Sequence, residues 1–197
     1  MPEEEMSTVA RPAFSTYSLT VCALLTAMSV VLARVLTLIP AETTRISLEA
    51  LPIVLAGLLC GPIPGALVGF AADLIGCLFS PFGYNPIFCV PPILYGLLAG
   101  AVRRYVTDRP ALLRTALAFF PAAIVGSVLW QSMALALVYG GDAKQAFFLA
   151  KLVSRGIQFA LTASVDTLIV WLLLRRGALS GVQRHIQAKG GRKHDDP

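Results

Sequence analysis

The chain has few charged residues and almost no histidine, and both shortages narrow what it can do. Only 14% of its 197 residues are charged, whereas 56% are hydrophobic. Its two histidines, His185 and His194, lie in a basic C-terminal segment, so none is available for chemistry within the apolar part. A soluble domain of this size cannot bury so much apolar surface, because surface area grows nearly as fast as mass. The composition therefore predicts an all-α integral membrane protein.

Sequence motifs for nucleotide hydrolysis and metal catalysis are also missing. The chain contains no G-x-x-x-x-G-K-[ST], no H-E-x-x-H and no C-x-x-C. Its four cysteines have no metal-like spacing and are interpreted as packing residues, so no cofactor and no metal are expected. The net charge of +5 lies mostly at predicted helix ends and in the tail, which indicates membrane topology rather than nucleic-acid binding. These absences disfavour an integral membrane enzyme, and any uphill transport must draw energy from an ion gradient or a partner.

Apolar runs predict six transmembrane helices at about 20 residues per span. The predicted helices are Tyr17–Leu38, Ile46–Cys60, Ile63–Phe79, Ile87–Val102, Leu112–Tyr139 and Ala146–Leu174. We expect residues 1–16 to form a cytoplasmic N-terminal segment, 17–176 the six-helix domain, and 177–197 a basic, disordered cytoplasmic tail. Proline is expected to delay or kink the fourth helix at Pro91–Pro92 and to interrupt the fifth at Pro121.

The turn Gly61–Gly65 joins the second and third helices with almost no loop, because glycine and proline at this density end one helix and start another. With six helices, both termini share one side of the membrane. That side receives eleven Lys and Arg residues and the other side five. Cytoplasmic loops carry the excess of positive charge, so both termini are predicted to be cytoplasmic and the ligand pocket to face outward.

A lone carboxylate, Asp73, lies about 15 Å above this turn at 1.5 Å per residue, near the middle of the bilayer. A charge at that depth is expensive and is a functional hypothesis by default. Polar and aromatic residues at the outer ends of other helices are predicted to share a cavity with it. The predicted substrate-binding residues are Arg34, Arg45, Asp73, Tyr84, Asn85, Trp130, Gln131, Arg155 and Gln158. Such a net basic, aromatic pocket suits an anionic ligand that carries a ring.

Structural roles remain open for several of these residues. Arg155 and Asp73 are alternatively a mutually neutralising pair, and Arg34 is alternatively a side chain that extends to the membrane interface. Tyr84 and Trp130 also fit interfacial aromatic residues. Asp166, near the inner end of the last helix, is interpreted as a structural cap or ion-pair partner.

Ala23 and Ala27 lie four residues apart in the inner half of the first helix. Small residues at this spacing form a flat stripe on which another helix can lie closely. The spacing alone leaves open whether that helix belongs to this chain or to a partner.

Several short motifs together resemble a known family. They are Arg45-Ile46-Ser47, Leu51-Pro52-Ile53, Ala56-Gly57, Gly61-Pro62, Gly65, Gly69, Asp73-Leu74-Ile75-Gly76, Pro81-Phe82-Gly83-Tyr84-Asn85-Pro86 and Gly96-Leu97-Leu98-Ala99-Gly100, with Arg34 and Ser154-Arg155-Gly156 also fitting. This pattern resembles the substrate-binding S components of energy-coupling factor (ECF) vitamin transporters, most closely the folate type. The resemblance covers roughly Leu19–Leu174.

The resemblance implies a multi-pass protein of a prokaryotic cell membrane that has no enzymatic activity and binds an anionic vitamin, with folate expected. It also implies a transmembrane coupling subunit that docks on the Ala23 and Ala27 face, and two cytoplasmic ATPases that supply the energy. The chain departs from the folate pattern at Trp130-Gln131-Ser132, where a smaller Asn-Thr type pair is expected. An S component for a queuosine-precursor or nucleobase-type ligand therefore stays open, as does a small proton-coupled carrier that uses Asp73 and Arg155.

Overall fold

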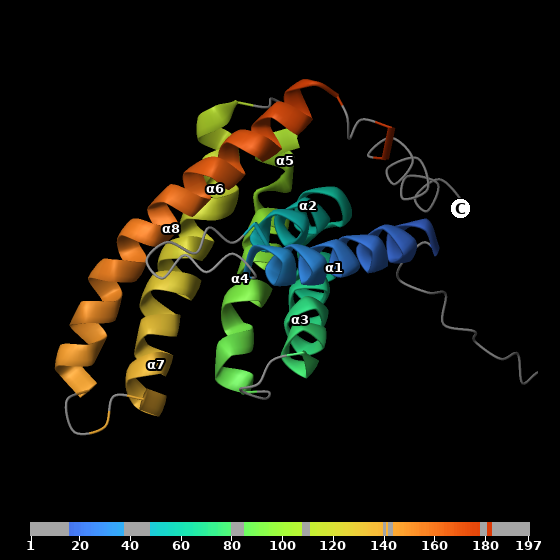
Figure 1. The fold of residues 1–197 in the computed structure, drawn as a ribbon. Helices are drawn as coiled ribbons and strands as arrows, with labels where there is room; N and C mark the ends of the chain where they lie inside the picture. The colour runs from blue at the N-terminus through green and yellow to red at the C-terminus, as the bar shows by residue number, and fades with distance from the viewer. Residues whose placement is uncertain are drawn as a thin grey trace, which may run out of the picture.

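The computed structural model describes residues 16–37, 48–79, 85–107, 111–139, 141, 144–177 and 181–182, and within these ranges it contains helices and no strand (Figure 1). The elements in chain order are α1 (Thr16–Thr37), α2 (Ala50–Cys60), α3 (Pro62–Leu78), η1 (Pro86–Cys89), α4 (Val90–Ala101), α5 (Arg103–Thr107), α6 (Leu112–Ala122), η2 (Ala123–Trp130), α7 (Gln131–Tyr139) and α8 (Lys144–Arg175). The predicted all-α class is confirmed for this part of the chain.

Three stretches of the described chain are long and apolar enough to cross a membrane: Thr16–Ala33, Leu112–Val138 and Lys144–Arg175. Their outward faces carry large exposed apolar side chains, such as Val153 and Ile157 of α8, which are 65% and 63% exposed. Exposed apolar surface of this kind fits contact with lipid. Three further apolar helices are shorter, and α2, with 11 residues, is only about 16 Å long. A hydrocarbon core of about 30 Å exceeds that length, so the count of six full spans stays a prediction.

The helices form two groups that meet at α4. The first three helices and α4 pack against one another, and α6, η2 and α7 follow one another along α8 (Figure 1). The α4 helix contacts both groups, because it packs on α2 and α3 on one side and on α6 and η2 on the other. The interior between the groups is where side chains from distant parts of the sequence meet.

Glycine permits the closest helix crossing in the fold. Gly61 alone separates α2 from α3, and its φ of +111° is one that side chains with a Cβ rarely adopt. Four residues after this turn, a Cβ added at Gly65 would lie 2.5 Å from the Gly96 carbonyl oxygen of α4 and 2.6 Å from the Gly57 Cα of α2. The short glycine–proline turn is confirmed, and the backbones of three helices nearly touch beside it.

Proline acts differently at its two predicted positions. Pro91 and Pro92 lie in the first turn of α4, which starts only at Val90 after the short 3₁₀ segment η1, so the predicted delay is confirmed. Pro121, by contrast, does not interrupt its helix. The chain stays helical beyond it as the π-type segment η2, and the Gln131 N–H bonds to the Gly126 carbonyl five residues back. Widening the helical hydrogen-bond pattern accommodates the proline, and such π segments are frequent at functional sites.

The connection after α4 is partly helical. Residues 103–107 form the short helix α5, and the side chain of Val106 is fully buried. One apolar residue, Val106, therefore anchors this short basic segment to the core.

Candidate functional site

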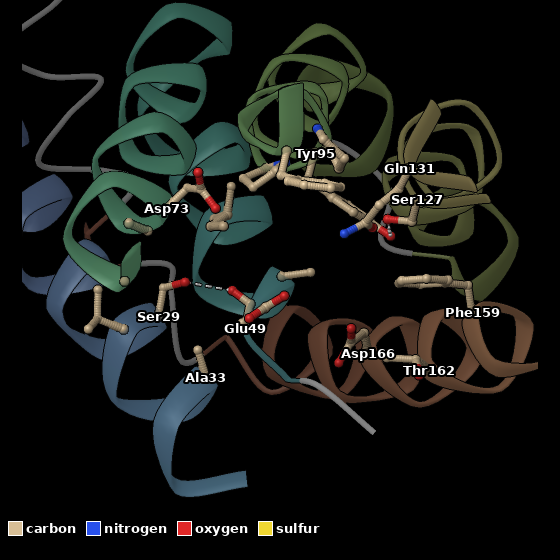
Figure 2. Close-up of a pocket in the computed structure, with 18 of the residues that line it drawn as sticks. Ser29, Ala33, Glu49, Asp73, Tyr95, Ser127, Gln131, Phe159, Thr162 and Asp166 are labelled. Carbon is tan, nitrogen blue, oxygen red and sulfur yellow. Dashed lines mark hydrogen bonds between the residues drawn. The ribbon is translucent and has the colours of Figure 1, made fainter. Parts of the chain in front are cut away.

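A cavity of about 280 Å³ lies between the two helix groups (Figure 2). Side chains of α1, α3, α4, α7, α8 and both non-α segments, together with the N-terminal end of α2, line it. Ligand pockets usually measure about 300–1,000 Å³ and occur between the helices of a bundle. This cavity is slightly smaller than the lower limit of that range. Its position between sequence-distant helices makes it the candidate binding site.

Carboxylates from three separate elements line the cavity. Glu49 comes from the residue before α2, Asp73 from α3 and Asp166 from α8, and Figure 2 shows them on different sides of the space. The described lining contains no lysine and no arginine. The described wall is therefore acidic and rich in hydrogen-bond acceptors, where the sequence had predicted a net basic pocket.

Asp73 is held in place by two thiols. The thiol of Cys89, in η1, donates to Oδ2 of Asp73 with a sulfur–oxygen distance of 2.6 Å, and that of Cys77 lies 3.9 Å from the same oxygen. The Cys89 contact joins η1 to α3, whereas the Cys77 contact lies within α3. The prediction that Asp73 lies in the site fits its position on the cavity wall.

Asp166, interpreted from the sequence as a structural cap or ion-pair partner, also lies on the cavity wall. Its side chain is 1% exposed, it lines the cavity, and its Oδ1 has no hydrogen-bond partner among the described residues. The signal that singled out Asp73, a charge within an apolar helix, applies equally to Asp166.

Aromatic side chains form the apolar walls. Phe88 and Tyr95 face the cavity from η1 and α4, and Phe159 faces it from α8. The hydroxyl of Tyr95 accepts a hydrogen bond from Ser127 Oγ of η2 at 3.3 Å, which ties the aromatic ring to the neighbouring helix. Flat apolar surfaces beside hydrogen-bond acceptors suit a planar ligand that carries donors on its edge.

Of the other predicted site residues, Gln131 lines the cavity, whereas Trp130 and Asn85 make structural contacts beside it. The indole N–H of Trp130 donates to the Ile87 carbonyl oxygen at 2.8 Å and so fastens η2 to η1. Oδ1 of Asn85 accepts from the Ile87 N–H at 3.2 Å and caps η1. Both residues stabilise the η1 segment, which in turn places Phe88 and Cys89.

Arg155 and Gln158 lie on α8 one turn from the cavity wall. The guanidinium of Arg155 lies over the ring of Phe159, with 5.9 Å between Cζ and the ring centroid. The backbone carbonyl of Gln158 accepts from Thr162 Oγ1 at 3.0 Å. Phe159 and Thr162 reach the cavity, and Arg155 and Gln158 support them.

The remaining predicted residues lie on α1 or outside the described part of the chain. Arg45, Tyr84 and the side chain of Arg34 lie outside the described residues. Ala23 and Ala27 are exposed on α1, and Ala23 borders a groove of about 240 Å³ between α1 and α3. Their exposure fits a face that is open to a partner helix, and docking there stays a prediction.

Comparison with known proteins connects this arrangement to one family. No curated protein matches the chain. A solved structure of FolT bound with folic acid is similar in fold, with a TM-score of 0.61 and 25% sequence identity, and the match covers 77% of this chain and 91% of that one. The family model described as "ECF transporter, substrate-specific component" matches residues 17–174, which is most of the chain. This chain therefore belongs to the family of ECF transporter substrate-specific components, which are transporter subunits and not enzymes.

Proposed function

We propose that this chain is the substrate-capture subunit of an ECF-type importer and that its ligand is folate. The observation that carries the proposal is a cavity walled by carboxylates and aromatic rings, in a chain whose fold is similar to that of FolT bound with folic acid. In this proposal the vitamin enters from the outer face of a prokaryotic cell membrane, and six spans leave both termini in the cytoplasm.

The pterin ring of folate matches the chemistry of the described cavity. It is flat, and one edge carries an amino group and a ring N–H, both hydrogen-bond donors. Carboxylate oxygens accept hydrogen bonds, so those of Asp73 and Asp166 complement that edge. Phe88, Tyr95 and Phe159 offer apolar surface for the faces of the ring.

The glutamate end of folate requires a different environment, because its carboxylates would be repelled by the acidic wall. We therefore expect that end to point away from Glu49, Asp73 and Asp166. Arg34, Arg45 and Arg155 are the candidates to bind it, since a guanidinium matches a carboxylate with two parallel hydrogen bonds. Tyr84 and Asn85 are also proposed to contribute to ligand binding.

Delivery into the cell is proposed to need partners, as the family implies. A transmembrane coupling subunit would dock on the exposed face of Ala23 and Ala27, and two cytoplasmic ATPases would supply the energy. Residues 1–16 and 177–197 are proposed to flank the membrane domain on the cytoplasmic side.

A nucleobase-type or queuosine-precursor ligand is the second candidate. The observation that favours it is the described lining itself, which holds three carboxylates and no basic residue. A ring with donor groups and no acidic tail would satisfy such a wall equally well.

The full-length chain, purified in detergent, allows a direct test. Mass spectrometry of the co-purified small molecule should identify a folate, and calorimetry should show that folic acid binds more tightly than guanine or a 7-deazaguanine. Co-purification of a purine-type ligand with no folic acid binding would overturn the folate assignment. Liposome uptake by this chain alone, driven by a pH gradient, would overturn the capture-subunit assignment in favour of a proton-coupled carrier.

A further inference from the structure

We propose that Asp166 of α8 is a specificity-determining residue of this site and that it accepts hydrogen bonds from the 2-amino edge of the ligand ring. This inference rests on the proposed function and deepens it by assigning the contact that reads the ring. Asp166 was not among the residues that the sequence singled out for binding.

The burial of Asp166 and the state of its carboxylate carry the argument. The residue is 1% exposed, yet it borders the cavity, and Oδ1 has no hydrogen-bond partner in the described part of the chain. In Figure 2 its carboxyl group points from α8 toward the side of the cavity where Glu49 lies. Buried acceptors are normally satisfied, and an unsatisfied one costs stability that a bound donor restores.

The other two carboxylates on the wall are less suited to this contact. Oδ2 of Asp73 already accepts from the thiol of Cys89 at 2.6 Å. Glu49 is exposed, so its carboxylate exchanges hydrogen bonds with water and gains less from a ligand donor. Among the three, Asp166 combines burial with an open acceptor.

The spacing along α8 suits a two-ring ligand. Phe159, Thr162 and Asp166 are separated by three and four residues, so they share one face of the helix, and all three line the cavity. Phe159 and Asp166 are seven residues apart, or about 10 Å along the helix axis. A fused two-ring heterocycle that stacks on Phe159 would span most of this distance and direct its far edge to Asp166.

The test is a double cycle that combines Asp166→Asn with removal of the ligand's 2-amino group. The probes are folic acid and 2-desamino-2-methylfolic acid, measured by calorimetry on the full-length chain. Asp166→Asn keeps the shape of the side chain and replaces an acceptor oxygen by a donor amide. The wild type should bind the 2-desamino probe about 10- to 150-fold more weakly than folic acid, the range for a hydrogen bond to a charged group. Asp166→Asn should lose a similar factor on folic acid and show little further loss on the 2-desamino probe.

Thr167→Val is the matched control. Thr167 is the next residue, is 3% exposed and also has an unpartnered hydroxyl among the described atoms, but it does not line the cavity. This variant should keep wild-type affinity for both probes. Asp166→Glu, which keeps the carboxylate but moves it by one methylene, serves as a second variant if the amide variant does not fold, and it should weaken folic acid binding more than that of the 2-desamino probe.

The outcomes separate the two levels of the proposal. Wild type that binds folic acid, with variants that lose the same factor on both probes or lose nothing, would overturn the role of Asp166 and leave the folate function standing. Wild type that binds neither probe would overturn the folate function and this contact with it. Non-additive losses at Asp166, with Thr167→Val unchanged, would support both.

Discussion

Replacing Gly65 by alanine tests whether the glycine crossing determines the stability of the fold. The added Cβ would lie 2.5 Å from the Gly96 carbonyl oxygen and 2.6 Å from the Gly57 Cα, whereas ordinary contacts begin at 3.4 Å. Both obstacles are backbone atoms, so no side-chain rotation relieves the overlap. The helices α2, α3 and α4 must separate by roughly 1 Å, in an interior that is otherwise closely packed.

The expected cost follows from two opposing effects. Overpacking in a core costs about 1–3 kcal/mol, and backbone obstacles on two sides put this site at the upper end. Alanine has a better helix propensity than glycine, which offsets about 1 kcal/mol. We therefore expect Gly65→Ala to lower the free energy of unfolding by about 2 kcal/mol.

Gly156→Ala is the matched control, because a Cβ at Gly156 of α8 meets no atom within 4 Å. It should unfold at or above the wild-type temperature. Thermal unfolding of both variants in the same detergent, followed by size-exclusion elution, measures the difference. Since Gly65 does not line the cavity, the folded fraction of Gly65→Ala should bind folic acid with wild-type preference over other ligands. The packing argument is refuted if Gly65→Ala unfolds at the same temperature as Gly156→Ala or above it.

Three further predictions concern the site and its partner face. Ala27→Leu should leave ligand binding intact but abolish transport and co-purification with the coupling subunit, because a large side chain would block the flat stripe formed by Ala23 and Ala27. Unchanged transport would contradict this prediction. Trp130→Phe removes the hydrogen bond to the Ile87 carbonyl and should lower the free energy of unfolding by about 0.5–1.5 kcal/mol. Thermal unfolding measures this loss, and an unchanged melting temperature would show that the bond is dispensable. Arg155→Ala should weaken folic acid binding by about 1.5–3 kcal/mol. It should change the binding of 6-methylpterin, which lacks the glutamate, much less. Equal losses for both ligands in calorimetry would instead assign Arg155 to positioning the Phe159 ring.

The sequence by itself determined where the helices lie along the chain. The end of α2 at Gly61 follows from covalent structure, because glycine tolerates a positive φ. The start of α4 just before Pro91 does so as well, because proline lacks an N–H donor. The predicted range Leu112–Tyr139 matches the continuous helical stretch from α6 to α7, because most of its residues are apolar. These features depend on neighbours in the sequence and need no knowledge of tertiary contacts.

Only the tertiary structure decided which polar groups face the cavity. Residue counts placed Asp73 near the middle of the bilayer and Asp166 near the inner end of the last helix, and they could not show that both residues border the same cavity. That depends on the rotation of each helix about its axis, which packing between α4, η2 and α8 sets. The hydrogen bond from Trp130 to Ile87 joins residues 43 positions apart, a contact that no local pattern specifies. Local sequence determines where most helices begin and end. The binding site depends on how the helices are oriented relative to one another, because residues of its walls meet only after the helices pack.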